Sequence, residues 1–268
     1  MRNLTSIVAA LLALALAPLA ASAQSYRTGL EDSPQAQLQA SADAGDRTAE
    51  FELGRRFYYQ RSVKDDAKAL HWFELAAQQG VPWAEYETAT MYINGEGAQA
   101  DAVKAMTWYR AAARDGILVA NYDIGYMYLT GEAVARDPAE SARWLKIAAD
   151  GGEPRAQYFL GLMYRDGTGV PQDYPQALKL LRAAAAQRVA PAAYALGDMI
   201  KQGKGVEKNL VLGQAWRIMG KYLEAPAQPD GRHIVGAYLV SPDLTQEQNR
   251  QAQEAYIRLM KELGFSEN

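Results

Sequence analysis

The sequence contains few residues that could perform chemistry as a set. It has two histidines, His71 and His233, and no cysteine. A zinc site needs three or four His, Cys or carboxylate ligands at defined spacing, and neither histidine has such neighbours in the sequence. The Gly-x-Ser-x-Gly, Ser-x-x-Lys and Lys-Thr-Gly motifs of serine nucleophiles do not occur. We therefore predict no catalytic residues, no metal site and no cofactor.

Two further patterns could carry chemistry, but each has a simpler structural interpretation. Paired glycines such as Gly167 and Gly169 could form a phosphate-binding loop, yet none continues into a Walker motif or follows a predicted strand. Helix termination at positive φ explains them better. Carboxylates could pair across the chain as general acid and base, but most acidic residues fall at expected helix caps or exposed helix positions, and no pair stands out.

A repeat of about 36 residues organises the whole chain. Tryptophan or leucine recurs at intervals of 36 residues, at Trp72, Trp108, Trp144, Leu180 and Trp216. Each copy begins with alanine at its position 1, namely at Ala49, Ala84, Ala120, Ala156 and Ala192. A period of this length indicates stacked supersecondary units rather than one globular core.

Each copy is predicted to form two antiparallel helices joined by a glycine-rich turn. Position 6 in the first helix is glycine in four copies, and glycine inside a helix costs about 1 kcal/mol relative to alanine. We therefore expect a neighbouring helix to approach closely there. The second helix opens at residues of the N-cap type, which are Asp65, Asp101, Asp137, Asp173 and Asn209.

The pattern Ala-x-Tyr-x-Leu-Gly-x-Met-Tyr-x-x-Gly-x-Gly-Val-x-x-Asp, followed by Ala-x-x-Trp and Ala-Ala-x-x-Gly, resembles the Sel-one-like repeat, a relative of the tetratricopeptide repeat. Residues 156–185 match it best, and the likeness covers about residues 34–223. The resemblance implies an all-α fold, a right-handed α/α superhelix of five helix pairs capped at both ends. The departures are a shortened first turn, Ala89 for glycine, Leu180 for tryptophan, and an imperfect fifth copy.

These signals predict the following organisation. A signal peptide occupies residues 1–23, and a linker with a capping helix occupies residues 24–48. The five repeats comprise residues 49–83, 84–119, 120–155, 156–191 and 192–223, and a loop with a capping helix occupies residues 224–268. Within this last part, His233–Val240 is predicted to be an extended packing segment.

The first residues have the layout of a secretory signal. Arg2 precedes an apolar run from Ile7 to Ala17, and a small-x-small cleavage site ends at Ala23. The alternative is an uncleaved membrane anchor, but the run is shorter than the roughly 20 residues that span a bilayer, and Pro18 interrupts it. We expect cleavage after Ala23, no integral membrane segment afterwards, and a periplasmic or secreted protein.

Charge and cysteine content exclude several partners. The chain has 28 basic and 31 acidic residues, and loss of Arg2 with the signal would change the net charge from −3 to −4. A mildly acidic chain without a basic tract is not expected to bind nucleic acid. The absence of cysteine argues against a lipid anchor and means that repeat stacking must supply the stability. We expect a monomer.

The C-terminal region is predicted to end in an amphipathic helix. Thr245 and Gln248 fit a capping box, and Gly264 ends the helix. Its apolar face comprises Ala252, Tyr256, Leu259 and Leu263. Such a helix would cover the open end of the repeat stack, and the alternative is a helix that docks on a partner.

The likeness to tetratricopeptide arrays implies that the first helices line the concave side, with positions 7, 10 and 11 of each copy facing the groove. The candidate partner-binding residues are Arg55, Tyr58, Tyr59, Thr90, Asn94, Tyr126, Thr130, Leu162, Arg165, Asp166, Asp198 and Lys201. Aromatic and arginine residues in a groove are typical binding anchors. The alternative is an inner face that is only solvated.

Taken with the lack of catalytic motifs, the resemblance implies a non-enzymatic exported scaffold or adaptor that binds a protein or peptide in its groove. One alternative is a binder or enzyme directed at the cell wall, with peptidoglycan or a β-lactam as ligand. A cysteine-rich exported branch of the family is linked to penicillin binding, but this chain lacks those cysteines. Another alternative is a secreted factor that contacts a host.

Overall fold

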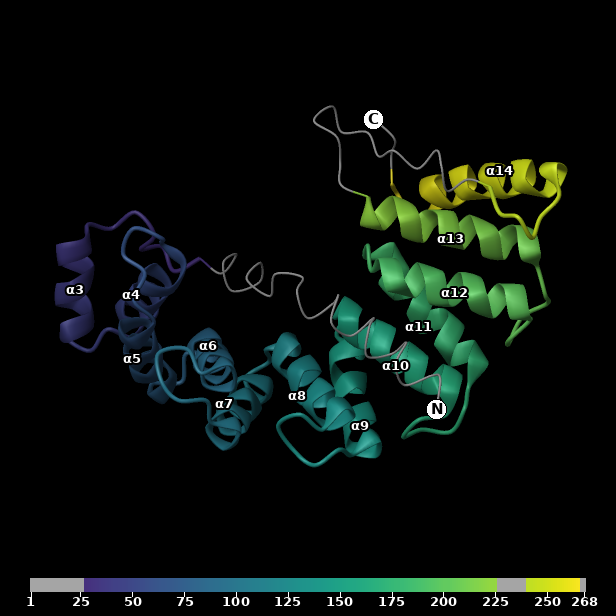
Figure 1. The fold of residues 1–268 in the computed structure, drawn as a ribbon. Helices are drawn as coiled ribbons and strands as arrows, with labels where there is room; N and C mark the ends of the chain where they lie inside the picture. The colour runs from purple at the N-terminus through teal and green to yellow at the C-terminus, as the bar shows by residue number, and fades with distance from the viewer. Residues whose placement is uncertain (1–26, 226–239, 266–268) are drawn as a thin grey trace. The chain divides into compact units, whose positions relative to one another are not determined.

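The computed structural model describes residues 27–225 and 240–265, and all regular secondary structure within these ranges is α-helical (Figure 1). The all-α class predicted from the sequence is therefore confirmed. The predicted signal peptide, residues 1–23, lies outside the described residues. So does the predicted extended segment, apart from its last residue, Val240.

The helices form two compact units. The first unit runs to Met127 and includes Gly131–Ala135, and the second comprises Tyr128–Thr130 and the chain from Arg136 onward. The first contains α3 (Gln35–Asp43), α4 (Arg47–Tyr59), α5 (Asp66–Gln78), α6 (Pro82–Asn94), α7 (Ala102–Arg114) and most of α8 (Leu118–Thr130). The second contains α9 (Pro138–Asp150), α10 (Pro154–Asp166), α11 (Tyr174–Ala186), α12 (Ala190–Gln202), α13 (Leu210–Glu224) and α14 (Gln246–Glu262).

The second helix of each copy begins at the predicted N-cap residue. The Asp101 carboxylate accepts from the backbone N–H groups of Val103 and Lys104 at 3.0 Å each. The Asp137 carboxylate does the same for Ala139 and Glu140. These bonds satisfy donors that have no partner inside the helix, so the cap prediction is confirmed.

The glycines at position 6 allow the two helices of one copy to approach closely. A Cβ atom added at Gly54 would lie 2.5 Å from the Phe73 ring, and one at Gly161 would lie 3.0 Å from Leu181. At Gly197 it would lie 2.7 Å from the carbonyl oxygen of Gly213. The predicted close approach is confirmed, and the neighbour is the second helix of the same copy.

The glycines of the turns pack against the preceding copy. Gly97 and Gly169 have φ angles of +76° and +72°. A Cβ atom at Gly97 would lie 2.3 Å from the carbonyl oxygen of Asp66, and one at Gly169 would lie 2.2 Å from that of Pro138. The first glycine of each pair, Gly95 or Gly167, ends its helix in the left-handed conformation, as predicted, and the second packs against the preceding copy.

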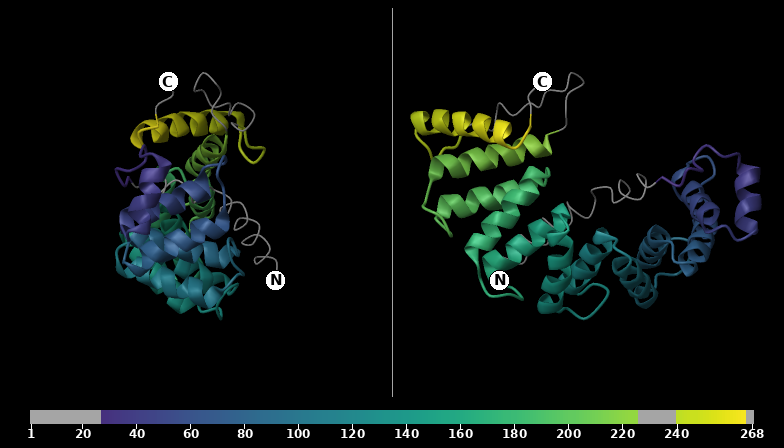
Figure 2. Two further views of the ribbon diagram at one scale, coloured as in Figure 1. Left: turned by 90° about the vertical axis from the view of Figure 1, so that its left-hand side faces the viewer. Right: turned by 180° about the vertical axis from the view of Figure 1, so that it is seen from behind.

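Each unit has a capping element at one end. In the first unit, Leu38 and Ala42 of α3 pack with Ala49, Leu53 and Trp72. In the second unit, α14 packs against α13, which is its neighbour in Figures 1 and 2. Its predicted capping box is present, since Thr245 and Gln248 bond to each other's backbone N–H.

The apolar face of α14 is used within the second unit. Ala252, Tyr256 and Leu259 are buried as predicted, whereas Leu263 is half-buried. Tyr256 lies 6.3 Å from Tyr222 of α13, measured between ring centroids. This face therefore packs against α13, and the side of α14 that remains exposed is mostly polar.

Arg188 shows how one copy tolerates the loss of a glycine. Second helices stop at Gly80, Gly116 and Gly152, and Arg188 takes the corresponding place with a φ of +68°. This conformation disfavours a side chain. The Arg188 guanidinium lies over the rings of Tyr222 and Phe265, at 6.0 and 5.1 Å from their centroids. These cation–π contacts offset part of the backbone strain.

Candidate functional site

The twelve candidate residues at positions 7, 10 and 11 are all half-buried or exposed. By contrast, position 3 residues such as Tyr86 and Tyr158, and the methionines at position 8, are buried. Positions 3, 7 and 10 share one face of the helix, so the difference in their burial comes from how far neighbouring helices cover that face. In each unit, the first helices therefore present the candidate positions to solvent.

Three candidate residues form a cluster at the end of α4 in the first unit. The Tyr58 hydroxyl donates to Glu96 Oε2 and the Tyr59 hydroxyl donates to Glu87 Oε1, both at 2.7 Å. The two rings meet edge to face with their centroids 4.7 Å apart. These bonds connect the first copy to the second and hold both rings in place.

Arg55, the third residue of this cluster, is held by an ion pair with Glu52. Arg55 Nη1 lies 3.0 Å from Glu52 Oε2, and the same oxygen accepts from the Thr28 hydroxyl at 3.1 Å. Arg56 Nη2 donates to the carbonyl oxygens of Leu30 and Glu31 at 3.0 Å each. Glu52 and Arg56 thus fix the segment before α3 on the surface of α4.

The other candidates of the first unit lie on α6 and α8. The Thr90 hydroxyl donates to the Tyr86 carbonyl at 3.0 Å and lies 3.2 Å from the Tyr109 hydroxyl. Asn94 is the exposed last residue of α6. Burial and the nearby Glu132 raise the pKa of Tyr126, so its hydroxyl is a neutral donor.

In the second unit, the candidate residues are mainly charged and paired. Arg165 makes a two-point contact with Asp166, at 2.8 and 2.7 Å. Asp198 lies 2.6 Å from Arg217 Nη1, and Lys201 lies 3.6 Å from Asp243. Leu162 is half-buried on α10, and Thr130 ends α8.

Four glutamates are exceptions to the sequence prediction that most acidic residues lie at caps or exposed helix positions. Glu50, Glu52, Glu85 and Glu87 are each only 3–4% exposed. They occupy positions 2 and 4 of the first two copies, which face neighbouring helices. The sequence did contain a sign of their burial. Positions 2 and 4 carry Gln157, Phe159 or alanine in the fourth and fifth copies, where the first two copies have glutamate.

Burial changes the acid–base behaviour of two of these residues. Desolvation raises the pKa of Glu87 to about 7, although the Tyr59 hydrogen bond and the charge of Arg55 oppose the shift. Desolvation, aided by the charge of Asp115, raises the pKa of Glu85 to about 7 as well. Burial is also the largest cause of the raised pKa values of Tyr58 and Tyr59, which keep both hydroxyls protonated.

Of the two histidines, only His71 lies within the described residues. His71 is exposed, with its ring 5.1 Å from the Trp72 ring, and His233 lies outside the described residues. Within residues 27–225 and 240–265, no group of three or more His, Cys, Asp or Glu side chains could hold a metal ion.

A helix that crosses a membrane would have to be both long and strongly apolar. No helix in the described part of the chain meets both conditions.

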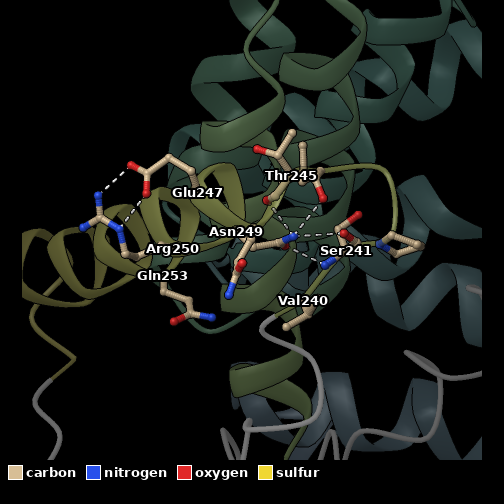
Figure 3. Close-up of a pocket in the computed structure, with 10 residues that line it drawn as sticks. Val240, Ser241, Thr245, Glu247, Asn249, Arg250 and Gln253 are labelled. Atoms are coloured by element: carbon tan, nitrogen blue, oxygen red, sulfur yellow. Dashed lines mark hydrogen bonds and ion pairs between the residues drawn. The ribbon is translucent and has the colours of Figure 1, made fainter.

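A hollow of about 980 Å³ lies beside the start of α14 (Figure 3). The buried Asn249 side chain accepts from Ser241 N at 2.7 Å and donates to the carbonyls of Ser241, Leu244 and Thr245 at 3.1 Å each. Arg250 is paired with Glu247 and Glu254. These groups join the loop to α14, and their hydrogen bonds are made within the chain.

Comparison with known proteins identifies the repeat. The Sel1 repeat model matches residues 48–81, 84–117, 118–153, 154–189 and 190–216. A comparison with curated proteins found no match.

Two solved structures are similar over most of this chain. A Sel1 repeat protein from Oxalobacter formigenes is 31% identical, with a TM-score of 0.61, and the match covers 72% of this chain and 76% of that one. A protective antigen of uropathogenic Escherichia coli strains, which displays an SLR fold, is 28% identical with a TM-score of 0.66. That match covers 83% of this chain but 48% of the E. coli chain, so this chain spans about half its length. The repeat match extends over more than half of the sequence, and the chain belongs to the Sel1 repeat family.

Proposed function

We propose that this protein is a non-enzymatic scaffold that binds a protein or peptide segment through positions 7, 10 and 11 of its first helices. The observation that carries the proposal is the contrast between buried columns and uncovered candidate positions in every copy. The columns are nearly uniform and build the fold, whereas the uncovered positions vary from Arg and Tyr to Asp and Lys. Variable side chains on a uniform scaffold are what selective binding requires.

The cluster of Arg55, Tyr58 and Tyr59 is the strongest anchor on this surface. Bonds to Glu96 and Glu87 hold the tyrosine hydroxyls, and the rings remain half-exposed. A partner would therefore meet aromatic surface that is already ordered. Ordered aromatic and arginine side chains lose little entropy on binding, which favours their use as anchors.

We also propose that the protein acts outside the cytoplasm, in the periplasm or after secretion. The support is the sequence pattern of Arg2, the apolar run and the small residues that end at Ala23. Cell fractionation with N-terminal sequencing tests this directly. We expect a chain that begins at Gln24 in the periplasm or medium, and an intact chain in the cytoplasm would contradict the proposal.

Affinity capture from cells after crosslinking tests the binding surface. The test protein is Arg55→Ala/Tyr59→Ala/Arg165→Ala. The control is Arg143→Ala/Lys179→Ala/Arg182→Ala, which changes exposed residues of second helices. We expect the first variant to lose partners that wild type and control retain and to keep its helical content, although loss of the Tyr59–Glu87 bond should lower its thermal stability. Recovery of the same partners by both variants would overturn the assignment of the surface.

A second candidate function is contact with a host as a secreted factor. It is favoured by the similarity to the E. coli protein, which is described as a protective antigen. Binding to host-cell surfaces that is removed by the Arg55/Tyr59/Arg165 variant would support it. The cell-wall alternative predicts turnover of a chromogenic β-lactam or of peptidoglycan, and we expect neither.

A further inference from the structure

Helix α6 buries two glutamates on different sides, and among the described residues neither has a basic partner of its own. Glu87 accepts from the Tyr59 hydroxyl of α4 at 2.7 Å and is 3% exposed. Arg55, whose charge acts on Glu87, lies 3.0 Å from Glu52. Glu96, in the loop after α6, adds a second negative charge near Glu87.

Glu85 faces the end of α7, and its surroundings differ from those of its counterparts. At position 2 of the first copy, Glu50 accepts from Gln79 Nε2 at 2.7 Å, and in the fourth copy Gln157 accepts from Gln187 Nε2 at 3.0 Å. The residue that corresponds to Gln79 and Gln187 in the second copy is Asp115, which offers a carboxylate instead of an amide. Glu85 Oε2 is buried and accepts no hydrogen bond from any group in the described part of the chain.

Three other charged groups near α6 have partners of their own. Glu74 of α5 accepts from the Tyr92 hydroxyl near the other end of α6, and Asp123 of α8 accepts from Tyr86 at 3.0 Å. Arg114, next to Asp115 on α7, pairs with Asp115 at 3.2 Å and acts on Glu85 only through its charge. By comparison, Glu52 is equally buried but lies within 4 Å of both Arg55 and Arg56.

We propose that α6 is a proton-dependent helix, which packs fully in the first unit when Glu85 and Glu87 are protonated and loosens when both become ionised. An isolated ionised carboxylate is unstable in a buried site, so the neutral acid is favoured there. Asp115 occupies the place where Gln79 and Gln187 donate in the first and fourth copies. A protonated Glu85 can instead donate to the Asp115 carboxylate. The proposal concerns the fold of the first unit and does not depend on the binding partner.

The direction of the pH dependence follows from proton linkage. An unfolded glutamate has a pKa of about 4.3, whereas burial raises the pKa of both Glu85 and Glu87 to about 7. The folded unit therefore holds extra protons between these values. Its stability is greatest in mild acid, falls as the pH rises toward 7, and stays low above 7.

Native-state hydrogen exchange of the purified protein at pH 5.5, 7.0 and 8.5 tests the proposal. After correction for the intrinsic exchange rate, we expect the opening constant of α6 amides to rise at least tenfold from pH 5.5 to 8.5. The Glu85→Gln/Glu87→Gln variant should show little change, because its amides cannot ionise. Helix α10 serves as internal reference, since Gln157 and Phe159 occupy the same positions there.

A transplant provides the matched gain-of-function test. Gln157→Glu/Gln187→Asp recreates the pair of Glu85 and Asp115 at the end of α10 and α11, and should make α10 pH-dependent. An α10 that stays insensitive would overturn the role of this pair. The whole proposal fails if α6 opens equally at all three pH values in wild type. It fails also if the double-glutamine variant keeps the wild-type pH dependence.

Discussion

Helices α6 and α10 occupy the same place in their repeats but satisfy their buried polar positions differently. In α10, the neutral amide of Gln157 bonds to Gln187 and to the carbonyl of Ala149. In α6, the corresponding positions carry Glu85 and Glu87, which are buried and have no basic partner of their own within residues 27–225 and 240–265. The same helix-pair backbone therefore accommodates either neutral or ionisable buried side chains. The residue types at positions 2 and 4 determine which of the two is present.

The exposed parts of the two units also carry different kinds of side chain. The first unit presents a cluster of tyrosines and arginine at the end of α4, whose hydroxyls bond to glutamates of the next copy. The second unit presents separate ion pairs, such as Arg165 with Asp166 and Asp198 with Arg217. Because exposed ion pairs contribute little stability, substitutions there should alter recognition more than folding.

The largest effect is expected where both units use the same packing. Gly97→Ala and Gly169→Ala would each place a Cβ atom 2.3 and 2.2 Å from a carbonyl oxygen of the preceding copy. Because the positive φ adds strain to this clash, we expect each substitution to lower the free energy of unfolding by about 3 kcal/mol or more. Gly116→Ala is the control, because its Cβ would meet open space, and it should cost about 1 kcal/mol. Urea unfolding measures all three, and a large difference between Gly97 and Gly169 would show that the units do not share this constraint.

The next largest effect concerns pH and should separate the units. Wild-type stability is expected to fall by roughly 2–3 kcal/mol between pH 5 and pH 8 through Glu87, whose pKa burial raises to about 7. Glu87→Gln should remove this part of the dependence and raise stability at pH 8. Calorimetric melting curves at several pH values give the answer. Glu254→Gln, on the exposed side of α14, is the matched control and should leave the pH dependence unchanged.

A smaller effect is expected at Arg188 in the second unit. Arg188→Gly removes the strain at a φ of +68° but also the contacts with Tyr222 and Phe265, so the two changes should nearly cancel. Arg188→Ala keeps the strain and loses the contacts, and should be about 1–2 kcal/mol less stable than Arg188→Gly. Equal urea midpoints for the two variants would show that the positive φ at this position imposes no strain on a side chain.

The smallest effect is expected at the helix caps, where the units should behave alike. Asp101→Ala in the first unit and Asp173→Ala in the second each remove a side-chain acceptor for a backbone N–H at 3.0 Å. Each should cost about 1 kcal/mol. Asparagine at either position should restore most of the loss, and a serious deficit in the asparagine variants would point to a role for the charge itself.

Most of the fold could be predicted because its determinants are local. The caps at Asp101 and Asp137, the positive-φ glycines of the turns and the capping box at Thr245 each act within a few residues of their own position. The candidate surface was predictable only as a set of positions. The hydrogen bonds from Tyr58 and Tyr59 to Glu96 and Glu87 could not be predicted, because these partners lie in the next copy.

The sequence alone determined the helix pairs, their ends and the close approach at Gly54 and Gly161, since a 36-residue period and small residues leave few other ways to bury the aromatic columns. Only the tertiary structure decided which glutamates are buried and which groups they meet. Glu87 and Tyr59 are 28 residues apart. Whether such side chains are hydrated or desolvated depends on neighbours that the stacking brings together, and this desolvation sets their protonation.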